Sequence, residues 1–372
     1  MSTTYGYGAI SPFMQALGCS FPSASSFHLI KRRYLEPAVE KLYDDQHKKV
    51  VSIGEEALLK GEKLTLSGDA QFDSRGYSAI WGRYVIALMS TGLILAFANV
   101  SKKIESTSSQ RLECIGLKRC LSEIKAIYKA YSNPISMLTT DRHREATKMM
   151  REDNPSIQHK FDAWHFCRNI LLALLKISHA KCRQTLSPWI SYINNHIWWS
   201  ITSSTSAQEC REKYLSVLYH VRGIHAWPED TSFTVHKECA HAVHVSRRKY
   251  IETDSQAFEA LEKLIRTPSY LNDIDSVSGD LGTAEIEGFN HVATLHEPKD
   301  RYFGLEGHNL RTKIAIIRHN EAQFDSLAGL REPSIKRKYY DKTFKCYKER
   351  LIRPPPVHKW RHSLTQEMYT IR

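Results

Sequence analysis

Three carboxylates stand in this sequence where an apolar stretch ends or where a helix is expected to begin. Asp69 closes the run KLTLSGD, Asp141 closes PISMLTTD, and Glu287 follows Thr283 in TAEIEGFN. Mg²⁺ is a hard ion that prefers carboxylate oxygens. Two divalent ions close together activate an attacking water or 3′-hydroxyl and stabilise the leaving oxygen of a phosphodiester. The three acids therefore predict a site for two Mg²⁺ or Mn²⁺ ions.

Each acid also has an ordinary structural explanation. Asp69 is the preferred first ligand, and Asp73 is the reserve, as a group behind the metal or an Asx-turn residue. Asp141 precedes a predicted helix, so a helix N-cap is its alternative role. The alternative for Glu287 is an ordinary acidic residue in the first turns of a helix, a position that the helix dipole favours.

Four further residues are predicted to surround the metal site. Arg142 and His143 follow Asp141 and are expected to contact the scissile phosphate, with an exposed helix start as the alternative for His143. His165 either orients a phosphate or packs the following segment against the core, and we favour packing. Asn290 lies one turn after Glu287 and therefore on the same helix face.

The elements that would position these residues are predicted from periodicity. We expect a three-strand meander over 64–100, a helix over 113–130, a strand over 134–141, a helix over 144–152 and a fifth strand over 159–162. This β-β-β-α-β-α order is that of an α/β, RNase H-like core: a mixed five-stranded sheet with flanking helices, interrupted by a large all-helical insertion. Further helices are expected over 27–61, broken at Pro37, over 255–266 and over 310–320. The predicted parts are 1–60 (helical, after a loose lead-in over 1–20), 61–165 (core), 166–280 (insertion), 281–325 (final core helices) and 326–372 (basic, aromatic-rich tail).

The charge distribution favours a polyanionic partner. The 372 residues carry a net charge of +12, and residues 331–372 hold 12 Lys or Arg against 4 Asp or Glu. Bases interleaved with aromatic residues suit a nucleic-acid surface, whereas the alternative is a solubilising, partly ordered extension. The predicted DNA-binding residues are Lys336, Arg337, Lys338, Lys342, Lys345, Lys348 and Arg350.

The cysteines give no sign of a metal ribbon or a disulfide framework. Eight are scattered without a CxxC pair, so buried reduced thiols are expected. The cluster of His236, Cys239, His241 and His244 departs from the spacing of a zinc finger, which argues against zinc. No apolar run is long enough for a membrane span and no secretory pattern is present, so an intracellular protein is expected.

Short strings in a fixed order resemble the DDE transposases of metazoan DNA transposons, specifically the Mutator-like group and its uncharacterised animal relatives. The resemblance covers about residues 25–320 and implies an RNase H-like core, an all-helical insertion before the last acid, and cut-and-paste transposition with Mg²⁺ or Mn²⁺. It maps Asp69, Asp141 and Glu287 onto the three acids. The strings are SGDAQFDSRGYSA, TDRH, DAWH, NNHIWW, TAEIEGFN and EPKDRYF.

The resemblance predicts a nuclear, DNA-bound transposase or a protein derived from one, acting as a homo-oligomer. Relatives usually carry an N-terminal zinc-based DNA-binding domain, whose pattern this sequence lacks, so a fragment or a host-adapted derivative is expected. Three alternatives remain open. They are a catalytically silent DNA-binding protein of transposase origin, a structure-specific nuclease using the same acids, and, more remotely, a zinc-dependent structural module.

Overall fold

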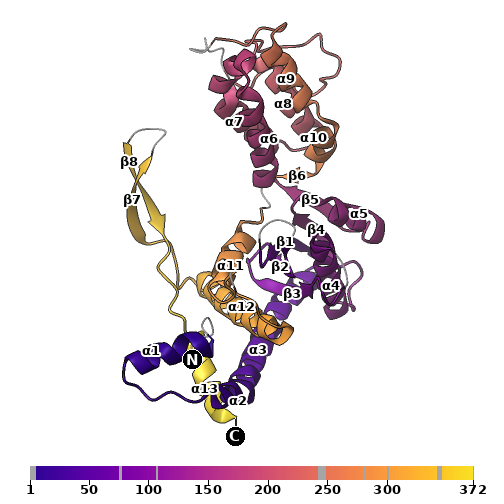
Figure 1. Cartoon of the computed structure of the whole chain (residues 1–372). Coiled ribbons are helices and arrows are strands. Elements are labelled where there is room, and N and C mark those ends of the chain that lie inside the picture. Colours follow the sequence, from indigo (N-terminus) through magenta and orange to yellow (C-terminus); the bar gives the residue numbers. More distant parts are fainter. Residues whose placement is uncertain are drawn as a thin grey trace. The chain divides into compact units, whose positions relative to one another are not determined.

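A computed structural model describes residues 6–74, 78–105, 108–241, 249–279, 282–299, 301–341 and 346–371 (Figure 1). The chain divides into two compact units, residues 1–136 with 284–372 and residues 137–283. The strands are β1 (Leu64–Phe72), β2 (Trp81–Leu88), β3 (Ile94–Ser101), β4 (Ile135–Thr140), β5 (Gln158–Asp162), β6 (Val277–Ser278), β7 (Ile335–Asp341) and β8 (Cys346–Ile352).

The α-helices are α1 (Tyr7–Ala16), α2 (Ala24–Ile30), α3 (Glu36–Leu59), α4 (Leu112–Ile127), α5 (Arg144–Asp153), α6 (Ala163–Ser178), α7 (Ile190–Thr202), α8 (Ala207–His220), α9 (Gln256–Ile265), α10 (Pro268–Asp273), α11 (Ala284–Thr294), α12 (Leu305–Leu327) and α13 (Trp360–Thr370). Shorter turns are the π-helical η1 (Lys31–Leu35) and the 3₁₀ segments η3 (Ser109–Arg111), η4 (Lys181–Trp189) and η5 (Ile274–Ser276). No helix within the described ranges combines the length and apolar character needed to cross a membrane.

The predicted mixed sheet with flanking helices is confirmed. β1, β2 and β3 pair antiparallel, β4 and β5 pair parallel, and the two-residue β6 adds a short parallel strand beside β5. The strand order is β3-β2-β1-β4-β5-β6. β4 begins in the first unit, where Leu64 N donates to Pro134 O over 2.8 Å, and ends in the second.

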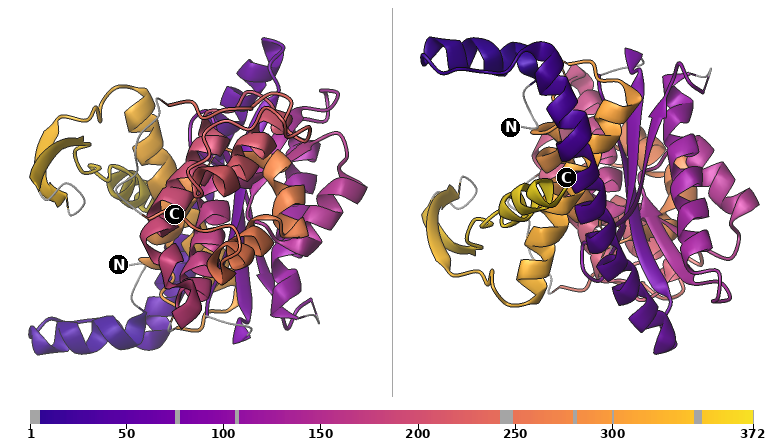
Figure 2. Two further views of the ribbon diagram at one scale, coloured as in Figure 1. Left: turned by 90° about the horizontal axis from the view of Figure 1, so that it is seen from above. Right: turned by 90° about the horizontal axis from the view of Figure 1, so that it is seen from below.

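Alternation along the strands determines which helices cover each face of the sheet in the first unit. Val85 and Ala87 of β2 belong to the core formed with α3, α11 and α12, whereas Tyr84 points toward α4. Figure 2 shows α4 on one side of these strands and α3 with α12 on the other. Gly116 permits the approach of α4, since a Cβ there would lie 2.6 Å from Cβ of Tyr84.

The second unit has its own core. Four helices, α6 to α9, pack buried side chains such as Phe166, Ile193, Tyr214 and Leu261 against one another. Tyr214 is fully buried, and its hydroxyl donates to Ile265 O over 3.0 Å. The part of 221–255 that the structure describes lies between α8 and α9 without forming a helix, so the region between them is not helical throughout.

One sequence prediction needs correction: the expected loose lead-in contains α1, whose Tyr7 ring packs 5.8 Å from Phe21. The predicted division of the 27–61 segment near Pro37 is found, because α3 begins at Glu36, with Pro37 in its first turn, and follows α2 and the π-helical η1. The described part of the basic tail forms the β7–β8 hairpin and α13, whose buried Trp360 joins the core of the first unit.

The cysteine prediction holds only in part. The seven described cysteines are free thiols, but only Cys120, Cys167 and Cys210 are buried. Cys19 and Cys346 are exposed, and Cys114 and Cys239 are half-buried.

Candidate functional site

Two of the predicted acids, Asp69 and Glu287, belong to the first unit, and the third, Asp141, to the second. The surroundings of each acid are described within its own unit. Comparisons of the chain with protein-family models, curated proteins and solved structures find no match.

The register of the meander points Asp69 toward α11. Asp69 lies opposite Val85 in the β1–β2 ladder, and opposed residues in an antiparallel pair project to the same face. Val85 faces the core that contains Phe289 of α11. The half-buried Asp69 carboxylate is therefore held on the face that α11 covers.

Asn290 connects α11 directly to this carboxylate. Its Nδ2 donates to Asp69 Oδ2 over 2.8 Å, and its backbone oxygen accepts from Gln71 Nε2 over 3.2 Å. Glu287 lies one turn earlier on the same helix and is exposed. Because residues three apart share a helix face, the contact brings the Glu287 face of α11 toward β1.

A buried ion pair supports the Asn290 amide from behind. Arg83, with a side chain 4% exposed, pairs with Glu297, and its guanidinium also donates to Gln71 and, over 3.5 Å, to Asn290 Oδ1. This donor fixes the amide orientation, with its nitrogen toward Asp69. Burial lowers the pKa of Arg83, and the charges of Glu297 and Asp69 oppose that shift.

Asp73, the reserve first ligand, has a structural role. Its Oδ1 accepts from Ile80 N over 3.1 Å and its Oδ2 from Trp81 N over 3.2 Å. Both oxygens thus secure the connection between β1 and β2. This supports Asp69 rather than Asp73 as the acid available to a metal.

In the second unit, Asp141 and His165 meet at the ends of two parallel strands. The β4–β5 register pairs Thr140 with Phe161, so Asp141 and Asp162 follow at the same edge. His165 Nε2 lies 3.3 Å from Asp141 Oδ1. The imidazole that the sequence placed as a packing residue therefore contacts the predicted metal ligand.

Asp162 anchors this arrangement, a role the sequence analysis missed. Asp162 caps α6 by accepting from His165 N over 3.0 Å, and its other oxygen accepts from Thr283 N over 2.8 Å. The sequence carries a signal for this role, since an Asp between a short strand and a helical segment is a typical N-cap.

The two residues after Asp141 are both engaged. His143 is the N-cap of α5, with Nδ1 accepting from Ala146 N over 3.4 Å, so Asp141 is not the cap. Burial lowers the pKa of His143. Arg142 donates from Nε to Asp273 Oδ2 over 2.7 Å and stacks on the rings of Phe166 and Tyr270.

The predicted DNA-binding residues lie on a hairpin of the first unit. In the β7–β8 register Arg337 faces Arg350 and Tyr339 faces Lys348, which puts three cations and one aromatic ring on a single face. Arg337 and Arg350 oppose like charges, an unfavourable pairing that an anion would relieve. Lys336 and Lys338 lie on the other face, and Lys342 and Lys345 lie outside the described residues.

A separate cluster in the second unit differs from the one weighed in the sequence. His220, His225, Cys239 and His241 each offer one ligand atom, all within 4.8 Å of one another. His220 and His225 were missed, His236 is not a member, and His244 lies outside the described residues. The available signal was His220 at the end of α8, five residues before His225.

Proposed function

We propose that this protein is a DDE-type transposase, or a protein derived from one, that cleaves and transfers DNA strands with Mg²⁺ or Mn²⁺. Asp69, Asp141 and Glu287 would hold two ions. One ion would activate water for cleavage, or the freed 3′-hydroxyl for transfer, and the other would stabilise the leaving oxygen.

The observation that carries this proposal is the Asn290–Asp69 hydrogen bond of 2.8 Å. It joins the strand with the first acid to the helix with the third, as an RNase H-like site with its last acid on a helix requires. The β-β-β-α-β-α order, with an antiparallel meander followed by parallel β4 and β5, supports the same fold.

The proposed substrate is DNA, bound by a homo-oligomer in the nucleus. The basic face of the β7–β8 hairpin would contact phosphates, which gives affinity largely without sequence readout. A two-stranded ribbon is also a known way of approaching duplex DNA.

A strand-joining assay tests the transfer step. A pre-cleaved duplex with a labelled 3′-hydroxyl end would be incubated with plasmid and Mn²⁺, using native protein and Asp141→Asn. Joined products with the native protein only are expected. Cleavage without joining would favour the structure-specific nuclease, and salt-sensitive binding without either reaction would favour the silent DNA-binding protein.

A further inference from the structure

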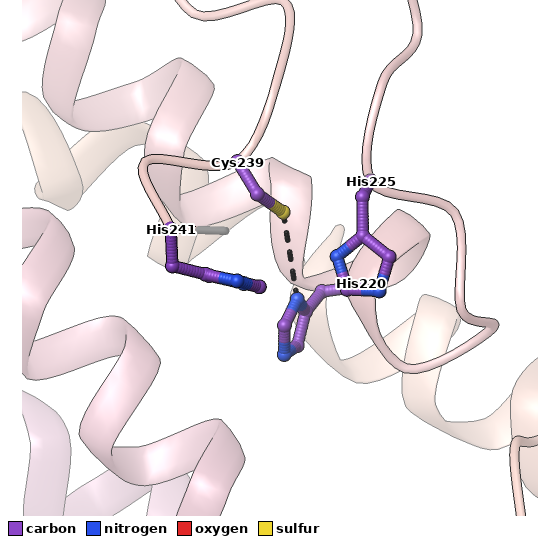
Figure 3. Close-up of side chains that lie close together, drawn as sticks. All are labelled: His220, His225, Cys239 and His241. Carbon is purple, nitrogen blue, oxygen red and sulfur yellow. Dashed lines mark hydrogen bonds between the residues drawn. The ribbon is translucent and has the colours of Figure 1, made fainter. Parts of the chain in front are cut away.

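Three imidazoles and one thiol converge in the second unit (Figure 3). His220 ends α8, and the other three come from the segment that follows it. Cys239 Sγ lies 3.5 Å from His220 Nδ1. The rings of His220, His225 and His241 lie 5.1 to 5.2 Å apart, centre to centre.

The arrangement matches a tetrahedral metal site. The three rings are nearly perpendicular to one another, at 81° to 89°, so they surround a common centre rather than stack. Bond lengths of about 2.0–2.3 Å to nitrogen and sulfur imply ligand atoms about 3.3–3.8 Å apart in a tetrahedron. The four ligand atoms lie within 4.8 Å of one another, and a bound ion would draw them to that separation.

The backbone that supplies the ligands is held in place independently. Ala226 and Glu238 form an isolated antiparallel bridge, and Cys239 N donates to His225 O over 2.8 Å. This bond places two ligands side by side on neighbouring stretches of chain. The positions of His225 and Cys239 therefore follow from main-chain hydrogen bonds.

A buried acid on α8 pins the same segment. The Glu212 carboxylate, 3% exposed by residue, accepts from Thr234 N at 3.0 Å, Val235 N at 2.7 Å and His236 N at 2.7 Å. These bonds fix the chain just before Cys239 against the helix that ends in His220. The four ligands are thus presented by a preorganised frame.

The ligand types select the metal. Imidazole and thiolate ligands in a tetrahedron suit Zn²⁺, whereas Mg²⁺ and Ca²⁺ require oxygen. Four protein ligands leave no open position, as in structural rather than catalytic zinc sites.

We propose that His220, His225, Cys239 and His241 bind one structural Zn²⁺ that ties residues 225–241 to the end of α8. This site is independent of the proposed Mg²⁺ or Mn²⁺ chemistry. It also forms part of the wall of a cavity of about 460 Å³ lined by aromatic residues, among them Trp189, Trp199 and Tyr250. Loss of zinc is therefore expected to loosen that wall.

The first test measures metal in the full chain, purified without a metal-affinity step. Elemental analysis should give about one zinc per chain, and Cys239→Ser should bind zinc at least about tenfold more weakly, since even supporting residues change affinity by that factor. The exposed Cys19→Ser is the matched control and should retain native zinc.

A second measurement covers the outcome in which Cys239→Ser fails to fold. Native protein stripped by a chelator and loaded with Co²⁺ should show thiolate-to-cobalt absorption and tetrahedral d–d bands, displaced by one equivalent of Zn²⁺. Hydrogen exchange should rise in 221–241 of the stripped protein while β1 to β3 stay protected. Protein that neither contains zinc nor takes up Co²⁺, or unchanged zinc binding in a folded Cys239→Ser, would overturn the proposal.

Discussion

Asn290 on α11 donates a hydrogen bond of 2.8 Å to Asp69 on β1, across 221 residues of sequence. Glu287 lies three residues before Asn290 on the same helix. The contact therefore ties the first proposed metal ligand to the helix that carries Glu287.

Replacing Asn290 with Asp tests whether a cation binds beside Asp69. Asn290→Asp removes a donor and adds a like charge, so the free energy of unfolding should fall by about 1–3 kcal/mol in chelator. Millimolar Mg²⁺ or Mn²⁺ should restore part of this loss, as measured by urea denaturation. Asn309→Asp, which alters an Asn99–Asn309 contact instead, is the control. Equal responses of both variants to metal would contradict a cation at Asp69.

The Arg83–Glu297 pair predicts a large stability effect. Arg83→Met leaves the 10% exposed Glu297 side chain without its main cation, which should cost about 3–5 kcal/mol. The double variant Arg83→Met/Glu297→Leu should recover most of that loss. Arg119→Met breaks the exposed pair with Glu105 and should cost less than about 1 kcal/mol. Similar losses for Arg83→Met and Arg119→Met in urea denaturation would refute the buried pair.

Glu212 predicts a defined acid sensitivity. Although burial opposes it, donation from Thr234, His236 and Val235 lowers the pKa of Glu212 to about 2, from 4.5. A carboxyl with a depressed folded-state pKa stabilises the protein above its unfolded value, so this contribution is complete above pH 4.5 and is lost as the pH falls toward 2. Glu212→Gln should lose about 1.5–3 kcal/mol at pH 7.

The same variant should show a flatter decline in stability between pH 4.5 and 2 than the native protein. Urea denaturation at several pH values, followed by tryptophan fluorescence, measures this slope. Glu259→Gln, exposed on α9, should retain the native slope. If the stability of Glu212→Gln fell with pH as steeply as that of the native protein, the Glu212 carboxylate would not be the group that causes the acid sensitivity.

The hairpin face predicts a salt-dependent contribution to DNA binding. Arg337→Ala/Arg350→Ala should weaken binding and reduce the slope of log K against log salt by about 2, one for each lost phosphate contact. Lys60→Ala/Lys63→Ala removes the same charge from exposed positions after α3. Fluorescence anisotropy from 50 to 200 mM salt, about the range over which such contacts matter, should separate the pairs. Identical slopes would assign the effect to net charge alone.

Local patterns predicted much of the sheet, because the alternation of apolar and polar residues along a strand, and an Asp after an apolar run, are visible within a few residues. β1 to β5, α4 and α5 follow such patterns, and Asp141 directly follows β4 as expected. Asp69 was expected to close its strand but lies within β1, which continues to Phe72. Glu287 was predicted to begin a helix, and it lies in the first turn of α11.

Features that depend on distant contacts were missed. The strands of the β7–β8 hairpin carry polar residues on both faces, so they show no alternation of apolar and polar residues that would predict them. Helix α1 is stabilised by aromatic contacts from Tyr7 to Phe21 and Phe27. His220 and His225 meet Cys239 only because a short bridge folds the segment back. The Asp141–His165 contact likewise requires the parallel register of β4 and β5.

Plasmid nicking tests the central claim, that Asp69, Asp141 and Glu287 form one metal site for phosphodiester cleavage. Native protein and Asp73→Asn should nick supercoiled DNA with Mg²⁺ or Mn²⁺ but not in chelator. Asp69→Asn, Asp141→Asn and Glu287→Gln should each lose about 100-fold or more, with DNA binding retained, because metal ions supply several kcal/mol of transition-state stabilisation. Native activity in any of these three variants, or absence of metal-dependent nicking in the DNA-bound native protein, would contradict the account.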